Sequence, residues 1–191
     1  MSLIRTFIAI KASDEVRKRC ANLIRTLGAG DIEVTWTRTQ NLHHTLKFLG
    51  DTDDTQLPSV CRAMALAAAT IEPFVVESVG VGAFPRMEAP RTVWVGAGAG
   101  AEAMIALHHA LDQELHQVGF ALEARRFQPH LTLGRVRKGG ETRETLARLI
   151  NDHRDFHVGH TSVGEVTLFS SVLEKGGPVY EVLGRAPLGT R

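Results

Sequence analysis

A four-residue pattern, His-x-Thr-Leu, occurs twice in the 191-residue chain, in NLHHTLKFLG and in QPHLTLGR. Its histidines, His43 and His130, are separated by 87 positions, close to half of the chain. Both copies lie in short segments rich in apolar and β-branched residues, which favour strands. The repeat predicts two duplicated halves whose motif strands face one another across a central cleft.

Strand geometry indicates which side chains of each motif share a surface. Residues two apart in a strand point to the same face of the sheet. His43 and Thr45 should therefore project together, with Phe48 in the layer behind them. His130 and Thr132 should repeat this arrangement. Each motif is thus expected to present an imidazole and a hydroxyl on one rigid surface.

The rest of the chain mixes helical and strand patterns without regular βαβ alternation, and this favours an α+β fold with largely antiparallel sheets and helices on the outside. Strands are expected at 3–10, 33–37, 43–49, 74–84, 92–95, around His130, and at 156–158, 162–171 and 179–183. Helices are expected after Ser13 and at 55–70, 101–118 and 141–150. No Pro/Ser-rich linker interrupts this pattern, so residues 1–191 are interpreted as a single bilobal domain.

The ends of the first helix have local signals. Ser13 is a typical N-cap residue, and Gly28 and Gly30 are typical of a helix end. The GAGAG stretch at 96–100 lacks the lysine and the spacing of a phosphate-binding loop. It is interpreted as a turn between a strand and a helix.

Composition limits the kind of partner. The chain has 22 Lys+Arg against 21 Asp+Glu, a net charge of +1. That balance argues against binding nucleic acid by broad phosphate neutralisation but is compatible with a small, local phosphate site. Cys20 and Cys61 are too few for a disulfide framework, which is typical of a reducing compartment. With no secretory signal and no long apolar run, we expect a cytoplasmic protein that does not enter a membrane.

Two histidines and two hydroxyls in one pocket supply what the opening of a cyclic phosphate needs. One group must deprotonate the attacking water, another must protonate the leaving ribose oxygen, and donors must hold the phosphoryl oxygens. Imidazole suits both proton transfers because it titrates near neutral pH. A single His-x-Thr would more often be an ordinary half-buried strand pair. Because the motif occurs twice, a catalytic site becomes a real alternative to an ordinary strand pair.

The residues at this point resemble a known family. NLHHTLKFLG and PHLTLGR look like the two signature motifs of the 2H phosphoesterase superfamily, and in particular of its RNA 2′,3′-cyclic phosphodiesterases, also called 2′-5′ RNA ligases. The resemblance extends from RTFIAI near the N-terminus through AFPRMEAPRTVWVG to SSVLEKGGPVYEVLGRAPL. It implies a bilobal α+β fold and hydrolysis of a 2′,3′-cyclic phosphate to a 2′-phosphate without a metal.

The resemblance also implies roles for individual residues. His43 would protonate the leaving 3′-oxygen and His130 would activate water, while Thr45 and Thr132 would hold the phosphate. Arg135 matches a basic position of the family. Phe7 matches an aromatic residue near the pocket that would stack on a base.

Four positions keep alternative interpretations. Ideal alternation puts Arg135 on the face opposite His130, unless a bulge at Gly134 returns it to the cleft. Phe7 is either a core residue or a stacking platform. Lys47 either adds charge to the phosphate pocket or lies on a solvated rim. Arg126 is a candidate for a basic rim beside Arg135.

The remaining histidines are interpreted without a metal. His44 points away from His43 and is expected to be structural. Two groups occur elsewhere in the chain: His153, His157 and His160, and His108, His109 and His116. Neither group offers two ligands on one helical face at i, i+4 spacing. All are therefore expected to be surface histidines, and no metal or other cofactor is predicted.

We therefore expect a monomeric, cytoplasmic hydrolase of RNA ends or short oligonucleotides that carry a 2′,3′-cyclic phosphate. Reversible 2′-5′ ligation in vitro would be the same chemistry with a 5′-hydroxyl in place of water. One alternative is a cyclic phosphodiesterase of small nucleotides. Another is a non-catalytic RNA-end or nucleotide-binding module, although binding alone does not need two titrating groups.

Overall fold

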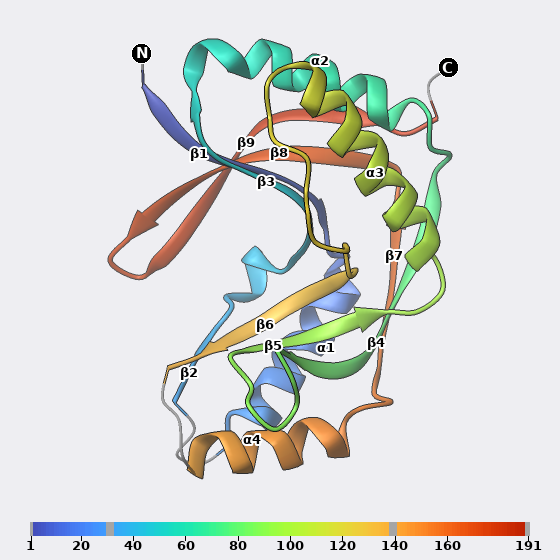
Figure 1. Ribbon diagram of the computed structural model, residues 1–191. Helices are drawn as coiled ribbons and strands as arrows, with labels where there is room; N and C mark the ends of the chain where they lie inside the picture. The colour runs from blue at the N-terminus through green and yellow to red at the C-terminus, as the bar shows by residue number, and fades with distance from the viewer. Residues whose placement is uncertain (1, 30–32, 138–140, 190–191) are drawn as a thin grey trace.

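The computed structural model describes residues 2–29, 33–137 and 141–189 of the chain (Figure 1). Its strands are β1 (Leu3–Lys11), β2 (Val34–Trp36), β3 (His43–Asp53), β4 (Phe74–Phe84), β5 (Thr92–Ala97), β6 (His130–Val136), β7 (His157–Val163), β8 (Glu165–Glu174) and β9 (Gly177–Pro187). Its helices are α1 (Asp14–Leu27), α2 (Leu57–Ala68), α3 (Ala101–Gln117) and α4 (Glu141–Asp152), with short 3-10 turns η1 (Thr39–Asn41) and η2 (Asp54–Gln56).

The strands form one sheet in the order β7-β4-β5-β6-β3-β1-β8-β9, with β2 added beside β6. Each of these pairings is antiparallel. The predicted α+β fold with antiparallel strands is therefore confirmed. The two strands that carry the motifs, β3 and β6, are neighbours at the centre of the sheet.

Two helix pairs cover two parts of the curved sheet (Figure 1). Helices α2 and α3 pack over β1, β3, β8 and β9 around one core, while α1 and α4 pack over β4–β7 around a second. The two-lobed arrangement is thus present. Each lobe combines segments from both halves of the chain, because the N-terminal β1 and the C-terminal β9 belong to the same lobe.

Helix α1 follows its sequence signals. The Ser13 hydroxyl accepts the Val16 N–H at 3.2 Å and caps the first turn. Gly28 is the C-cap, and its N–H bonds to the Ile24 carbonyl at 2.8 Å. Gly30, predicted as part of the same stop, lies outside the described residues. The turn predicted at 96–100 is shorter, because Gly96 and Ala97 belong to β5, and Gly100 lies directly before α3 with φ 84°.

Several strand boundaries differ from the prediction, since β5 continues to Ala97, β7 spans His157–Val163 and β9 spans Gly177–Pro187. The expected strand at 43–49 continues to Asp53, where it pairs with the start of β1. The expected strand at 162–171 is interrupted, since β7 ends at Val163 and β8 begins at Glu165. Gly164 separates them, and a Cβ added there would meet open space. Apolar residues on both sides of Gly164 hid this break from the sequence pattern.

Among the described residues, no helix combines the length and the apolar character needed to cross a membrane.

Candidate active site

The two motifs lie side by side in the sheet. Strands β3 and β6 run antiparallel with His44 opposite Leu131. This register places His43 across from Thr132, and Thr45 across from His130, on the face opposite His44. In an ideal antiparallel pair, the two histidines would then be diagonal neighbours roughly 7–8 Å apart, and so would the two threonines. The predicted meeting of two imidazoles and two hydroxyls on one surface therefore rests on a direct strand pairing.

The same backbone device orients both imidazoles. His43 Nδ1 lies 2.6 Å from the Asn41 carbonyl oxygen, and His130 Nδ1 lies 2.7 Å from the Gln128 carbonyl oxygen. A carbonyl can only accept, so Nδ1 carries a hydrogen in both rings. This leaves Nε2 of each ring as the atom that can gain or lose a proton.

Aromatic rings flank each imidazole. The His43 ring centroid lies 4.9 Å from Phe7 and 5.4 Å from Tyr180. The His130 ring lies 5.0 Å from Phe84, edge to face, and 6.4 Å from Trp94. These walls fix the rings and displace water from them.

Burial lowers the pKa of both histidines below their ordinary value of 6.5. At His43 the Asn41 carbonyl opposes this lowering and the nearby His130 adds to it. At His130 the Gln128 carbonyl opposes it and Arg135 adds to it. In the free protein at pH 7 both rings are therefore mainly neutral. A bound phosphate anion would favour protonation.

The motif hydroxyls face the same cleft as His43, whereas His130 is not among the described residues that line it. Thr45 Oγ1 lies 2.9 Å from His43 Nε2, and in the neutral ring this hydroxyl donates to the nitrogen. Thr45 and Thr132 both line a cleft of about 350 Å³ together with His43. Both threonines are thus placed to donate to a phosphate.

A β-bulge follows each motif and changes which side chains reach the cleft. On β3, Thr45 and Lys47 face consecutive residues of β1, which leaves Leu46 as the extra residue. On β6, Thr132 and Gly134 face consecutive residues of β5, which leaves Leu133 as the extra residue. A bulge shifts the alternation by one position. The fifth residue after each histidine therefore points to the cleft instead of behind it.

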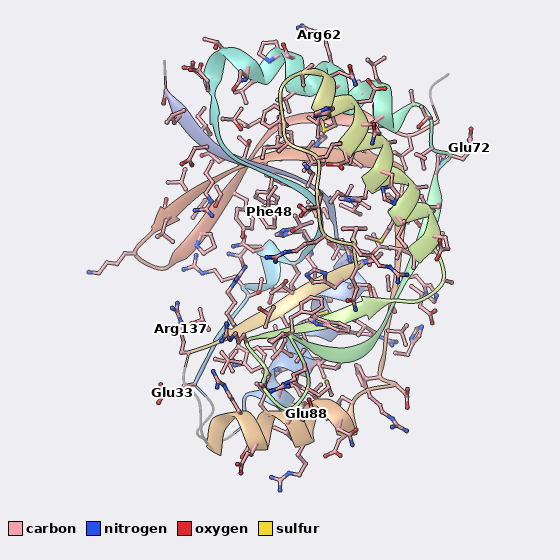
Figure 2. The ribbon with its side chains drawn as sticks, in the orientation of Figure 1. Glu33, Phe48, Arg62, Glu72, Glu88 and Arg137 are labelled. Carbon is pink, nitrogen blue, oxygen red and sulfur yellow. The ribbon has the colours of Figure 1, made fainter. Side chains whose placement is uncertain are left out.

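Two predictions about β3 are corrected by its bulge. Phe48, expected behind the motif, is 64% exposed and lines the cleft, where Figure 2 labels it. Lys47, expected in the pocket or on its rim, is only 5% exposed and forms an ion pair with Asp112. The bulge turned Lys47 toward α3 and Phe48 toward the cleft.

The bulge on β6 resolves the position of Arg135. Gly134 is tightly enclosed, because a Cβ there would lie 2.7 Å from the side chains of Trp36 and Val34. Arg135, one residue on, is exposed and lines the cleft beside Thr132. Of the two interpretations given by the sequence, the structure has the one in which Arg135 returns to the histidine face.

Phe7 lines the cleft but presents little surface to it. Its side chain is 3% exposed and is packed between His43 and Phe169, with ring centroids 4.9 and 5.3 Å away. Phe7 therefore packs against the His43 ring and helps to hold it in place. Phe48 offers a more accessible ring for a base.

Basic side chains give the cleft a local positive charge. Arginines from β1, the β2–β3 connection, β6 and the residue directly after β6 line it: Arg5, Arg38, Arg135 and Arg137. Among the described residues, its lining includes no Asp, Glu or Lys. Arg126, the other candidate for the basic rim, is exposed but does not line this cleft. The protein thus concentrates positive charge here despite its near-neutral total.

Three of these arginines were not predicted from the sequence. Arg5 lies two residues before Phe7, and Arg137 two residues after Arg135, so alternation from either assigned residue would have found them. Arg38 comes from a connection, where no strand period applies. Figure 2 shows Arg137 on the opposite side of the cleft from Phe48.

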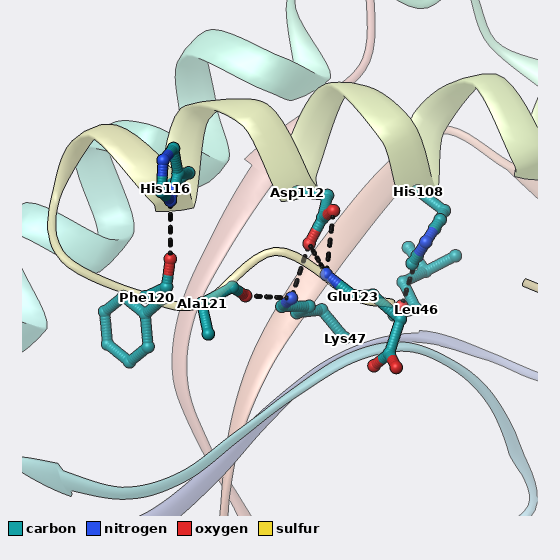
Figure 3. A network of polar contacts seen from close by, with 8 residues as sticks. All are labelled: Leu46, Lys47, His108, Asp112, His116, Phe120, Ala121 and Glu123. Carbon is teal, nitrogen blue, oxygen red and sulfur yellow. Dashed lines mark hydrogen bonds and ion pairs between the residues drawn. The ribbon is translucent and has the colours of Figure 1, made fainter. Parts of the chain in front are cut away.

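A buried polar network fixes the segment that leads into His130 (Figure 3). Lys47 Nζ donates to Asp112 and, at 2.7 Å, to the Ala121 carbonyl. The Asp112 carboxylate also accepts the Glu123 N–H at 3.1 Å. Lys47 follows the first motif, and Ala121 and Glu123 precede the second, so this network links the two motifs.

Two histidines near this network are buried. His44 is fully buried, and burial lowers its pKa to about 4, which supports its predicted structural role. His108 was expected on the surface but is 3% exposed. Its Nδ1 donates to the Leu46 carbonyl at 2.8 Å, and its ring stacks on Phe127 at 4.2 Å.

Sequence comparisons agree with this geometry. A sequence model of the 2′-5′ RNA ligase superfamily matches residues 33–173. An RNA 2′,3′-cyclic phosphodiesterase of Methanothermobacter thermautotrophicus is 36% identical over 177 residues, or 93% of this chain and 95% of its own length. One of Thermotoga maritima is 33% identical over 94% of this chain and 93% of its own.

Solved structures have the same fold. The protein TT0787 of Thermus thermophilus superposes with a TM-score of 0.78 at 26% identity, over 97% of this chain and 98% of its own. Escherichia coli LigT in its apo form superposes with a TM-score of 0.75 at 24% identity, over 98% of this chain and 99% of its own.

The fold and the paired His-x-Thr motifs define a 2H phosphoesterase, an enzyme class built on this arrangement. Within that class, the chain belongs to the 2′-5′ RNA ligase superfamily.

Proposed function

We propose that this protein hydrolyses RNA 2′,3′-cyclic phosphate ends to 2′-phosphate ends, with His43 as the acid and His130 as the base. The observation that carries the proposal is the matched pair of imidazoles, each with Nδ1 bonded to a backbone carbonyl and Nε2 left for proton transfer. The relatives at 33–36% identity are RNA 2′,3′-cyclic phosphodiesterases. Their names supply the substrate class.

In the proposed reaction, His130 Nε2 takes a proton from a water molecule as its oxygen attacks phosphorus. The bond between phosphorus and the 3′-oxygen breaks, and protonated His43 Nε2 gives its proton to that oxygen. Thr45 and Thr132 donate to the non-bridging phosphoryl oxygens, and Arg135 offsets their charge. The phosphate remains on the 2′-oxygen, and the proton gained by His130 passes to solvent.

The donor set of the cleft supports a mechanism without a metal. Zinc and other transition metals take thiolate, imidazole or carboxylate ligands, and catalytic zinc has three protein ligands. Of the cleft-lining residues in the described part of the chain, none is a Cys, Asp or Glu. Guanidinium and hydroxyl groups instead surround the phosphate position, and these stabilise negative charge without a cation.

A single chain supplies both histidines, so we propose that the 1–191 chain works as one bilobal domain and as a monomer. We also propose that it acts in the cytoplasm, since Cys20 and Cys61 are both free thiols. A 5′-hydroxyl could replace water in the attack. This would join two RNA ends by a 2′-5′ linkage when such ends are concentrated.

The test is turnover of a short RNA that ends in a 2′,3′-cyclic phosphate, in EDTA, with the product phosphate located by its resistance to a 3′-phosphatase. We expect a 2′-phosphate product and no effect of the chelator. A 3′-phosphate product would reverse the assigned leaving oxygen. Turnover of cyclic mononucleotides alone would favour the small-nucleotide alternative, and binding without turnover would favour the binding-module alternative.

A further inference from the structure

Two of the histidines that were expected to be ordinary surface residues converge with a carboxylate on the outer strands. His157 and His160 belong to β7, an edge strand, and Glu77 belongs to its neighbour β4. One ligand atom from each of the three side chains lies within 4.8 Å of the others. The two imidazole rings are 5.2 Å apart, and His157 Nε2 lies 3.2 Å from a Glu77 carboxylate oxygen.

A β-bulge creates this convergence. His157 and His160 are three residues apart, so regular alternation would put them on opposite faces. Glu77 pairs with His160, Ser78 with Gly159, and Val79 with His157. Val158 is therefore an extra residue, and Gly159 has φ 140°. The bulge brings His157 back to the side of Glu77 and His160, which the sequence pattern could not indicate.

The carboxylate of Glu77 is held in place by backbone groups. One of its oxygens accepts the Ala99 N–H at 3.2 Å. The Glu77 N–H donates to the Ala99 carbonyl at 2.8 Å, and the Gly98 N–H donates to the Glu77 carbonyl at 2.9 Å. Gly98 leaves room for the carboxylate, since a Cβ there would collide with the oxygen that Ala99 holds. The other oxygen is thus positioned toward His157.

We propose that Glu77, His157 and His160 bind a zinc ion, with water as the fourth ligand. Imidazole nitrogens and a carboxylate oxygen are preferred zinc donors. A backbone hydrogen bond to a ligand, such as the one from Ala99 to Glu77, helps to fix its orientation. Tetrahedral bonds of about 2.0–2.1 Å require ligand atoms roughly 3.3 Å apart. The 3.2 Å separation of His157 and Glu77 already meets this, and the exposed His160 has a ligand atom within 4.8 Å of both.

This site is separate from the catalytic cleft. Strands β4 and β5 lie between β7 and the motif strand β6. The zinc would join the edge strand β7 to β4. It would also fix the start of α1, since the Ser13 hydroxyl donates to the His160 carbonyl at 2.8 Å. The expected consequence is greater stability, without a part in phosphate chemistry.

The experiment is a zinc titration of the chelator-treated full chain by calorimetry at pH 7.5, with cobalt absorption to report tetrahedral coordination. We expect one ion per chain. Loss of any one ligand, in His157→Ala, His160→Ala or Glu77→Gln, should weaken binding by at least about tenfold. His109→Ala, a surface histidine outside the cluster, and His43→Ala, in the cleft, should bind as the native chain does.

Thermal unfolding gives an independent measurement. At free zinc about 100 times the dissociation constant, the Tm of the native chain should rise by about 5–10 °C, and that of His157→Ala should not. His157→Ala should retain native RNA turnover in EDTA, which separates this site from the proposed function. The inference would be overturned by absence of zinc binding, by binding that survives all three ligand substitutions, or by binding that is lost in His43→Ala.

Discussion

Each of the two histidines that we propose as catalytic has its Nδ1 hydrogen bonded to the carbonyl oxygen two residues earlier, Asn41 for His43 and Gln128 for His130. This contact is local, so it forms as soon as the strand begins. It selects the same tautomer at both positions and leaves the two rings chemically alike. The different roles that we propose for them would then come from where the substrate places its water and its leaving oxygen.

The pH dependence of the reaction follows from the lowered pKa of both rings. The productive form has one ring neutral and one protonated, and its population in the free protein is largest between the two pKa values. Burial puts both below 6.5, so kcat/KM should peak below pH 6.5 and fall as pH rises. Bound phosphate raises these pKa values, so the kcat profile should lie at higher pH. A kcat/KM maximum above pH 7 would contradict this assignment.

Arg135 should contribute through the charge of the phosphate. Removing a hydrogen-bonding partner of a charged group costs about 1.5–3 kcal/mol, so Arg135→Ala should lower kcat/KM roughly 10- to 150-fold. Arg126→Ala is the matched control, since that arginine is exposed but outside the cleft. Steady-state kinetics should show less than about twofold change for the control. Equal effects of both substitutions would indicate that general surface charge, and not the cleft, attracts the RNA.

At the scale of single residues, strand alternation was enough to predict that four side chains lie on one face of the sheet: His43, Thr45, His130 and Thr132. It failed directly after each motif, at Lys47, Phe48 and Arg135. The cause is the bulge, which inserts one residue and reverses the alternation. A bulge depends on the pairing of two strands, so one strand's sequence does not show it, although Gly134 was a hint.

At the scale of elements, the connection from α3 to β6 is positioned by a buried ion pair. Lys47 and Asp112 are 5% and 6% exposed, and together they bind the backbone of Ala121 and Glu123. Burial alone would raise the pKa of Asp112, but Lys47 and the Glu123 N–H outweigh it and the pKa is lowered. The carboxylate thus stays charged inside the protein.

Breaking this pair should be costly. Asp112→Ala leaves the Lys47 charge buried and unpaired, which should lower the free energy of unfolding by about 3–5 kcal/mol. Lys47→Met combined with Asp112→Leu should cost less than Asp112→Ala, because no charge remains. Asp155→Ala, which removes an exposed ion pair with Arg154, should cost at most about 1 kcal/mol. Denaturant unfolding measures all three, and a double variant as unstable as Asp112→Ala would refute the explanation.

Helices were easier to predict than strand ends. The apolar stripe and caps of α1 and the limits of α3 are local features, and the structure has both helices where the sequence placed them. The break at Gly164 and the burial of His108 depend on contacts between distant segments. His108 bonds to Leu46, 62 positions earlier, which no local pattern contains.

At the scale of the whole molecule, near-neutral charge and a basic cleft coexist. The net charge is +1, yet four arginines line the cleft, and none of the described residues that line it is acidic. The sequence total could exclude broad phosphate binding, but the concentration of arginines required the fold. They come from three separate parts of the chain, and the sheet brings them together.

This charge distribution predicts a shallow salt dependence of RNA binding. For single-stranded nucleic acid, the logarithm of the binding constant falls with the logarithm of the salt concentration, with a slope of roughly −0.7 per phosphate contact. Two to four contacts therefore give a slope between about −1.4 and −2.8. Fluorescence anisotropy of a labelled cyclic-phosphate RNA, bound to a His43→Ala/His130→Ala variant, would measure this slope between about 50 and 500 mM salt. A slope steeper than about −5 would require an extended binding surface.

The central claim is that His43 protonates the leaving 3′-oxygen while His130 activates water. It is tested most directly with a 2′,3′-cyclic phosphate whose 3′-bridging oxygen is replaced by sulfur, because a thiolate leaves without protonation. On the natural substrate, His43→Ala and His130→Ala should each reduce turnover roughly 10²- to 10⁴-fold. On the sulfur substrate, most of the His43→Ala defect should disappear and the His130→Ala defect should remain. Rescue of His130→Ala instead, or equal defects of both variants on both substrates, would contradict the account.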